Sequence, residues 1–525
     1  MPEHFRALIV VLGVAIPAFW VARRAVVGRL MGREDFNRRC KLWFAVTLLA
    51  FLSHDFWLYT IFASLVLLMA GKKEHNPAAL YALLVVAVPG FEQPIPGMGL
   101  MEHIFAINHV RMLHLAILLP AALRLARQPS DPASGPWRIC DGLLLTYLLY
   151  SFVHRSMFDS VTGTMRFGFY LWLDIWLPYF VVTRTVRSVA ALKECMAALT
   201  LAVSITAVLA VFEMTRHWLL YESLRQALGL PISLPMYLTR GEGGALRANV
   251  TSLNAIALGY TMMIALIFSM GLARQLAARW QALFSMLVLA AGLFAALSRG
   301  PWVGAAAGIV TAMALGPGGL KRLVALVVLG AMGFGVLLLT PYADDFIDLL
   351  PFVGTVEPGS VEYRQRLFDV SMIVFWESPI FGVPDFLLHP AMQVMRQGQG
   401  IIDIVNTYIG VALSSGAVGL GLFVAPFLWI GLLLWRSLRK PACRDEELQP
   451  LGRSLLGALV GVAVTIATVS SITVIPVFYW MLLALCVTFV RQADAASVKD
   501  KSHAAVRAAT YGARHDNPYL GALSQ

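Results

Sequence analysis

Residues 396–423 read RQGQGIIDIVNTYIGVALSSGAVGLGLF and join two kinds of sequence. The first part is polar and carries Arg396, Asp403, Asn406 and Tyr408. The second part is apolar and rich in glycine, which is typical of a membrane helix that packs closely against a neighbour. The stretch therefore places side chains that could do chemistry at the boundary of a membrane helix.

A polar interval, residues 341–405, precedes this helix and contains acidic residues and arginines but no lysine. Lysine and arginine concentrate in the cytoplasmic loops of membrane proteins. All eight lysines of the chain fall in other segments, which we assign to the cytoplasm. The interval is therefore predicted to be a large periplasmic loop.

The composition requires a membrane protein. Of the 525 residues, 58% are hydrophobic and only 14% are charged, and the mean hydropathy is +0.72. Apolar runs of about 17–25 residues recur along the chain, and such runs can cross a hydrocarbon core of about 30 Å. They lack the alternation of barrel strands. We predict an all-α polytopic membrane protein with about 12–14 transmembrane helices and one large periplasmic loop.

Four regions follow from this pattern. They are residues 1–240, with N-terminal transmembrane helices and a first periplasmic segment; 241–435, a core that includes the loop 341–405; 436–490, with C-terminal transmembrane helices; and 491–525, a cytoplasmic tail predicted to be disordered. In the first region, the run 42–70 fits either a hairpin of two short helices or one long tilted helix. A further span is predicted over 78–92.

Several chemistries have no sequence motif. The chain shows no Walker A loop, no GxGxxG after a strand, no CxxC pair and no HExxH helix, so neither a cofactor nor a metal is predicted. The net charge of +11 resides mainly in short loops between spans, so it indicates topology and not a nucleic-acid partner. The run GPWVGAAAG at 300–308 indicates close helix packing more than a phosphate cradle.

Arginines occur where a site at the outer face would need them. Arg247 precedes a span, Arg299 lies in a short turn between two spans, and Arg364 and Arg366 lie in the large loop. A guanidinium donates two parallel hydrogen bonds to phosphate oxygens and keeps its charge. The alternative is that these arginines reach toward lipid phosphates or cap helices.

Asp403 and Asn406 are three residues apart and would share one face of a helix, with Tyr408 near the same end. This arrangement could set a base beside groups that orient a sugar hydroxyl. The alternative is that Asp403 is the N-cap of the helix and Asn406 a polar residue of its first turn. His389 is the only histidine of the loop and is either a second candidate base or a solvated residue.

Charged residues also occur within apolar runs. Asp174 lies in the middle of a predicted span, and Arg111 and His114 share a helix face. Such groups normally face a cavity or a partner in the membrane. A proton relay is one reading, and internal pairing of Arg111 with an acid is the other.

Four segments, taken together, resemble the O-antigen ligase and O-antigen polymerase superfamily. They are Arg247–Tyr260 (RANVTSLNAIALGY), Leu297–Gly308 (LSRGPWVGAAAG), Tyr363–Val383 (YRQRLFDVSMIVFWESPIFGV) and Asp403–Phe423. Their order and spacing match the family over roughly residues 240–435. The resemblance implies a GT-C type glycosyltransferase of the bacterial inner membrane. It would act at the periplasmic face on undecaprenyl-diphosphate-linked oligosaccharide.

The resemblance also suggests the roles of individual residues. The family's diphosphate-binding arginines match Arg247 and Arg299, and its loop arginine matches Arg364 or Arg366. Arg396, Asn406 and Tyr408 are the other predicted substrate-binding residues, taken from the polar patch. The chain departs from the family at one position, because relatives place a histidine directly before the Asn-x-Tyr element and this chain has Val405 there.

The leaving diphosphate is stable as an anion, so the reaction needs positive charge and a base but no general acid. Asp403 is the first candidate base and His389 the second, and substrate positioning without a strong base is the third alternative. The missing histidine favours a polymerase of exopolysaccharide or capsule over a ligase that transfers glycan to lipid A core. A flippase or transporter and an assembly subunit remain as other classes. Expected partners are the lipid bilayer, a chain-length regulator and other polysaccharide-assembly proteins.

Overall fold

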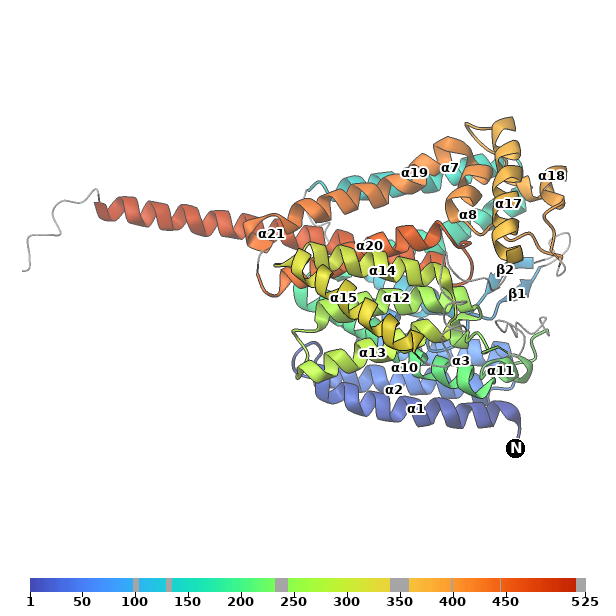
Figure 1. Cartoon of the computed structure of the whole chain (residues 1–525), viewed down its shortest axis with the longest axis horizontal. Helices are drawn as coiled ribbons and strands as arrows, with labels where there is room; N and C mark the ends of the chain where they lie inside the picture. Colours follow the sequence, from blue (N-terminus) through green and yellow to red (C-terminus); the bar gives the residue numbers. More distant parts are fainter. Residues whose placement is uncertain are drawn as a thin grey trace, which may run out of the picture.

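The computed structural model describes residues 1–97, 103–128, 135–231, 244–339, 358–397, 400–443 and 445–515. Most of the predicted loop 341–405 lies within these ranges, and its first part, 341–357, lies outside them. The long helices run side by side, and α17 (Pro358–Glu377) stands across one end of the bundle (Figure 1). We call this end, which also carries the N-terminus and α11 (Glu222–Ala227), the site end.

The all-α polytopic prediction is confirmed. In the described part of the chain, eight helical segments are long and apolar enough to cross a membrane. They are α1 (Glu3–Val26), His109–Ala126, α10 (Val189–Arg216), α12 (Ala255–Leu272), α15 (Gly319–Leu338), α19 (Thr407–Leu438), α20 (Leu448–Ile466) and the first part of α21 (Ile475–His515).

The sequence-based number of 12–14 helices also included shorter or more polar ones. These are α2 (Arg33–Leu52), α3 (Phe56–Gly71), α7 (Arg138–Ser156), α8 to α9 (Val161–Thr185), α13 (Arg279–Ala295) and α14 (Arg299–Ala314). Of these, α3 and α13 are apolar but only 16 and 17 residues long. The helix α21 continues to His515, well into the predicted tail.

The run 42–70 forms a hairpin of two helices, α2 and α3. Asp55 ends the turn between them, and its carboxylate accepts hydrogen bonds from the backbone of Trp57 and Leu58 at 2.8 and 2.9 Å. His54 adopts a positive φ of 52°, which lets the chain reverse direction. Because two polar residues make this turn, the hairpin reading is confirmed and the single tilted helix is wrong.

The predicted span 78–92 is wrong. The helix α4 (Pro77–Leu84) is eight residues long, and the chain then leads into a two-stranded antiparallel hairpin of β1 (Gln93–Pro96) and β2 (His103–Ile107). Residues 76–89 are all buried within the protein. The run is therefore apolar because other helices surround it and not because it faces lipid.

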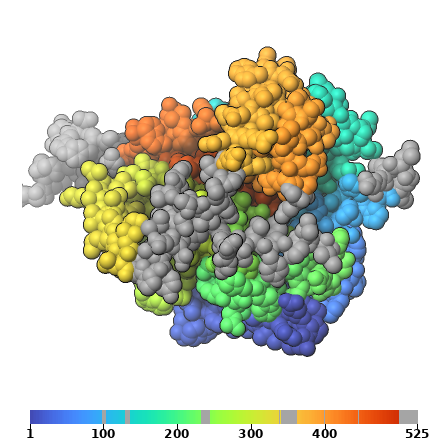
Figure 2. Space-filling view, turned by 45° about the vertical axis from the view of Figure 1, so that its right-hand side comes forward, coloured from blue at the N-terminus to red at the C-terminus, as the bar shows by residue number. Residues whose placement is uncertain are grey.

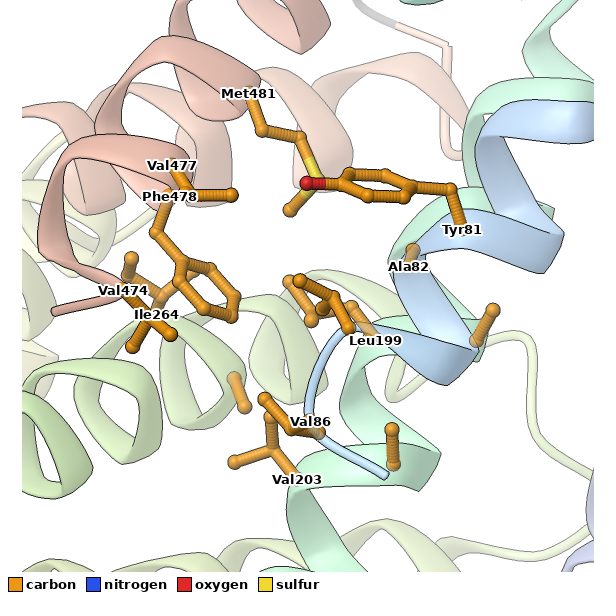
Figure 3. Packing of buried hydrophobic residues seen from close by; sticks show 14 of the residues in the cluster. Tyr81, Ala82, Val86, Leu199, Val203, Ile264, Val474, Val477, Phe478 and Met481 are labelled. Atoms are coloured by element: carbon orange, nitrogen blue, oxygen red, sulfur yellow. The ribbon is translucent and has the colours of Figure 1, made fainter. Parts of the chain in front are cut away.

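The centre of the bundle joins α4 to α10, α12 and α21. Figure 3 shows Tyr81 and Val86 facing Leu199 of α10, Ile264 of α12 and Phe478 of α21. Each of these side chains is at most 5% exposed. In lipid, close van der Waals packing of this kind holds helices together, since lipid tails are as apolar as the side chains.

Glycines bring α14 and α20 into close contact. A Cβ placed on Gly304 would lie 2.7 Å from the carbonyl oxygen of Gly461, and one on Gly308 would lie 2.7 Å from that of Gly457. A larger side chain at either position would push the helices apart. The glycines of 300–308 thus serve helix packing, as the sequence indicated.

The helix α19 is broken in its first half, at Gly416, where φ is 66°. The loop 379–383 fills the break with its backbone. Ala417 N donates to Pro379 O at 2.8 Å, and Val383 N donates to Leu413 O at 2.8 Å. In an unbroken helix, Ala417 N would donate to Leu413 O. The loop therefore replaces the hydrogen bond that the break removes.

This loop anchors a small unit made of α17, η4 (Phe386–Leu388) and α18 (Pro390–Gln393), which has its own apolar core. Leu413 of α19 belongs to that core. Figure 2 shows the unit, in orange, as a raised mass beside α7 and α8, in teal. Arg155 of α7 pairs with Asp385 at 3.2 Å, so the unit is tied to the bundle at two places.

Replacing Gly416 with alanine should destabilise the protein by several kcal/mol. The left-handed backbone costs an L-residue about 1–2 kcal/mol, and the new Cβ would lie 2.2 Å from the Ile380 carbonyl oxygen. Thermal denaturation followed by size-exclusion chromatography in detergent measures the effect. Gly421→Ala in the same helix is the matched control, since nothing lies within 4 Å of its Cβ position. Equal stability of the two variants would contradict the described break.

Candidate functional site

The predicted acid, Asp403, is held at the site end by the chain between α20 and α21. Within it, the 468–470 segment (Thr468, Val469, Ser470) contacts the start of α19. The Ser470 hydroxyl is hydrogen-bonded to Oδ1 of Asp403 and lies 2.8 Å from Ile404 O, and Thr407 Oγ1 donates to Val469 O at 2.9 Å. A hydroxyl has one proton and two lone pairs. A carboxylate only accepts, so the Ser470 hydroxyl donates to Oδ1 of Asp403.

The same segment contacts the turn that carries Arg299. A Cβ placed on Gly300 would lie 2.5 Å from Oγ1 of Thr468, so no side chain fits between them. Arg299 is the first residue of α14, and its side chain is half-buried. The turn with the arginine and the segment with the acid therefore both meet the 468–470 segment.

A backbone hydrogen bond of the next residue holds the Arg247 segment at the same end of the bundle. Ala248 N donates to Ala295 O at 3.1 Å, which fixes the chain around Arg247 to the end of α13, just before the Arg299 turn. The Arg247 side chain is half-buried, like that of Arg299. The structure thus brings together the two arginine segments that the sequence predicted for the diphosphate.

Glu213 holds the chain that follows Arg247. This residue lies in the last turn of α10 and is fully buried, and its carboxylate accepts hydrogen bonds from the backbone of Leu220, Asn249 and Val250 at 2.9–3.0 Å. The amides that Glu213 binds lie up to 37 residues away in the chain, so local sequence does not reveal these contacts.

The start of α19 differs from the prediction. Asn406 is the N-cap, and its side chain accepts from the backbone of Tyr408 and Ile409 at 2.9 and 3.2 Å. Residues 401–406 are not helical, so Asp403 and Asn406 do not share a helix face. The alternative in which Asp403 caps the helix is therefore wrong. The carboxylate of Asp403 contacts the Ser470 hydroxyl instead.

The Tyr408 side chain makes a hydrogen bond between two helices. Its hydroxyl donates to Ala463 O of α20 at 3.0 Å. The bond ties the first turn of α19 to the helix that leads into the 468–470 segment. Tyr408 and Asn406 thus position the acid in this structure, each through a bond to the protein.

His389 lies in the small unit and is engaged there on both sides of its ring. Nε2 lies 3.1 Å from Oε2 of Glu377, and Nδ1 accepts from Ala391 N at 3.2 Å as the N-cap of α18. A neutral imidazole has one donor and one acceptor nitrogen. With Nδ1 accepting, Nε2 donates to Glu377, so both ring nitrogens have partners within the protein.

A pocket of about 220 Å³ lies between α17 and the chain after α18. Its lining includes Tyr363, Arg366 and Arg396. The Tyr363 hydroxyl donates to the backbone carbonyl of Asp403 at 3.1 Å, so the pocket is next to the acid's own backbone. Arg364 lies on another side of α17, since two residues turn a helix by about 200°. Between the two candidates for the loop arginine, the structure favours Arg366.

Arg396 makes hydrogen bonds within the loop to which it belongs. Its guanidinium donates to Oε1 of Gln393 at 2.7 and 3.2 Å and to Gly400 O at 2.9 Å. These partners carry no formal charge, so they fix the guanidinium without neutralising it. Arg396 therefore gives the pocket a second positive charge beside Arg366, and Glu362 gives it one negative charge.

The charged residues within the N-terminal helices pair with one another. Arg111 lies 3.0 Å from Asp174 and 2.7 Å from Glu92, and Asp174 lies 3.5 Å from Nδ1 of His114. Nε2 of His114 is 2.9 Å from the Tyr81 hydroxyl. The prediction of internal pairing for Arg111 is confirmed. Among the described residues, no three His, Cys, Asp or Glu side chains come together as a metal site would require.

Part of the chain matches a known family. Residues 284–424 match the family model described as O-antigen ligase. The match contains the segments around Arg299, 363–383 and 403–423, and it confirms the resemblance seen in the sequence for this part of the chain. Arg247 precedes the matched residues. A comparison with curated proteins found no match.

The contact between the Arg299 turn and the 468–470 segment can be tested with a disulfide. A Cβ on Gly300 would lie 3.5 Å from Cβ of Thr468, and disulfides join Cβ atoms about 3.5–4.5 Å apart. The double variant Gly300→Cys/Thr468→Cys should cross-link under mild oxidation and show a mobility shift on a non-reducing gel that reductant reverses. The pair Gly300→Cys/Gly421→Cys is the control and should not. Absence of the cross-link in the first pair would show that the segments do not meet.

Proposed function

We propose that the protein polymerises undecaprenyl-diphosphate-linked oligosaccharide repeat units into a surface polysaccharide or exopolysaccharide. The observation that carries this proposal is that the Arg299 turn and Asp403 both meet the 468–470 segment, while the Arg247 segment is bonded to the end of α13, just before that turn. Two cations and one acid at one end of a membrane bundle fit a lipid-linked diphosphate donor and a hydroxyl acceptor. The family match over 284–424 supports glycan transfer in general.

The arginines and the acid have different roles in the proposed reaction. The acceptor hydroxyl oxygen attacks the anomeric carbon, the bond from that carbon to the diphosphate oxygen breaks, and the electron pair leaves with the diphosphate. Arg247 and Arg299 stabilise the charge that develops on this leaving group. Asp403 takes the hydroxyl proton, and its contact with Ser470 keeps the carboxylate in place.

We place the reaction at the periplasmic face of the inner membrane. The described part of the loop before α19 contains no lysine. At the opposite end of the bundle, Lys193 pairs with Glu447, and Lys440 pairs with Asp494 at 2.6 Å. This distribution supports a cytoplasmic location for that end. Oligosaccharide would then enter from the side of the small unit, where the Arg366 pocket offers polar groups to a sugar.

A ligase that transfers lipid-linked glycan to lipid A core is the second candidate, because the matched family model is described as O-antigen ligase. Val405 at the position of the family's histidine favours the polymerase. The products distinguish the two. A strain without a polymerase accumulates single lipid-linked units, whereas one without a ligase still makes long lipid-linked chains.

Deletion of the gene should therefore abolish long polymer and leave single units or short products, as read from extracted lipid-linked and surface glycans. Complementation with Arg299→Ala should fail at wild-type protein levels, and Arg299→Lys should restore part of the polymer, because lysine has charge but lacks the two-pronged donor. Long lipid-linked chains in the deletion strain would favour the ligase. Full activity of Arg299→Ala would remove this arginine from the site.

If Asp403 is the base, Asp403→Asn should lower polymer formation by about 10²- to 10⁴-fold, the usual range for loss of a general base. Asparagine still accepts a hydrogen bond from Ser470, so the fold is preserved. Ser470→Ala is the companion variant: it keeps the carboxylate but removes its contact, and a smaller loss is expected. Polymer yield per amount of membrane-inserted protein is the measurement. Near-normal output from Asp403→Asn would contradict the assignment of the base.

A further inference from the structure

A buried arginine lies in the first half of α20, near the end of the bundle opposite the site. Arg453 is only 9% exposed, and the residues of this helix from 451 to 459 are all buried. Its Nε donates to Gln449 O in the same helix at 3.3 Å. Among the described residues, Nη1 and Nη2 have no hydrogen-bond partner. One backbone contact therefore holds a charged group that lies inside the protein.

The charged groups that act on Arg453 are themselves arginines. They are Arg274, just after the end of α12, and Arg322, in the first turn of α15. Within the described part of the chain, no acidic side chain forms an ion pair with any of the three. Three positive charges from three different segments thus lie close together.

The turn between α14 and α15 lies against the Arg453 guanidinium. A Cβ placed on Gly316 would clash with Nη1 of Arg453, so the glycine leaves room for this side chain. The same turn carries the second arginine, since Arg322 N donates to Gly318 O at 3.1 Å. The guanidinium of Arg453 therefore lies between α20 and this turn, and not on a surface of α20 that faces lipid.

A buried charge needs a charge of opposite sign. Taking an ion out of water costs free energy, which is regained only through an opposite charge and hydrogen bonds. Around Arg453 the acting charges have the same sign, so they add repulsion. A guanidinium does not lose its proton in a protein, so Arg453 cannot become neutral. This arrangement fits an anion that comes from outside the chain.

The surroundings favour a lipid as the source of the anion. The side chains of Arg274 and Arg322 are exposed at this end of the bundle. The helix α15 has outward-facing apolar side chains nearby, such as Leu320 and Val324, which are 77% and 55% exposed. Figure 2 shows α15, in yellow, on the outside of the bundle. A phospholipid would place its phosphate at the arginines and its chains along α15, whereas a soluble anion would use only the arginines.

We propose that Arg274, Arg322 and Arg453 bind the phosphate group of an anionic phospholipid. Basic clusters at the ends of transmembrane helices attract such head groups, and guanidinium forks match phosphate oxygens in pairs. The bound phosphate joins the first turn of α15 to α20 and to the chain after α12. It stabilises the packing of these helices and takes no part in glycan transfer.

The variant Arg453→Met tests the need for a counter-charge, through thermal denaturation of the purified full chain in detergent. Without lipid, the variant should have a Tm equal to or above that of the wild type, because a buried charge without an opposite charge has been removed. Added cardiolipin should raise the Tm of the wild type and leave that of Arg453→Met nearly unchanged. A lower Tm without lipid, together with a full response to cardiolipin, would overturn the proposal.

A double variant tests the other two arginines without a change in the interior. Arg274→Gln/Arg322→Gln should bind cardiolipin about 30-fold more weakly in native mass spectrometry, the factor expected for two basic residues near an anionic head group. Both side chains are exposed, so the variant should fold. Arg279→Gln/Arg436→Gln is the matched control, because it removes two exposed arginines that do not act on Arg453. Equal losses in the two variants would show only a general effect of charge and would overturn the proposal.

Two further additives identify the source of the phosphate. Inorganic phosphate and phosphatidylethanolamine, each added to the lipid-free wild type, should raise the Tm less than cardiolipin does. An equal increase from inorganic phosphate would overturn the assignment to a lipid and leave a soluble anion. An equal increase from phosphatidylethanolamine, which has no net charge, would overturn the requirement for an anionic head group.

Discussion

The pairing of the loop 379–383 with the break in α19 is the interaction on which the site end depends. Within a membrane, a helix cannot simply stop, because unpaired backbone groups in lipid cost several kcal/mol each. Here Ala417 N and Leu413 O both find partners in the loop. Gly416 and Gly382 have φ near 66°, and a Cβ on either would meet backbone atoms closer than 2.5 Å. The requirement to satisfy the backbone thus fixes the small unit, and with it the Arg366 pocket, beside the start of α19.

The polar groups of the candidate site are held by the backbone and by buried side chains. Glu213 binds two amides beside Arg247, those of Asn249 and Val250, and Ser470 lies between the carboxylate of Asp403 and a carbonyl. Catalysis of glycan transfer needs charges that are in place before the reaction begins. A site assembled from four chain segments meets this need only if each segment is anchored. Close packing of α14 on α20 supplies the remaining constraint, since it carries the Arg299 turn to the end of α20.

Local sequence predicted well what depends on local chemistry. Apolar runs indicated the membrane helices, and the run 42–70 allowed either a hairpin or one long helix, a choice that the turn at His54 and Asp55 decides. The span over 78–92 failed because burial in protein and burial in lipid select the same side chains. The cap was assigned to Asp403 as an alternative, although Asn406 provides it, since both residue types cap helices about equally well. Ser470 could not be found, because it contacts Asp403 across 67 residues of sequence.

The departure at Val405 now has a structural interpretation. Val405 packs against the apolar core of the small unit, together with Ile402 and Ile404. An imidazole at this position would be surrounded by apolar side chains, where its charged form is costly. This chain uses position 405 for packing, so the transfer proposed above takes its proton acceptor from a neighbouring group. Asp403 is two residues away, and its carboxylate contacts a hydroxyl in the segment that also meets the Arg299 turn. In that proposal, the packing of Val405 in the small unit and the use of Asp403 as the base follow from the same local arrangement.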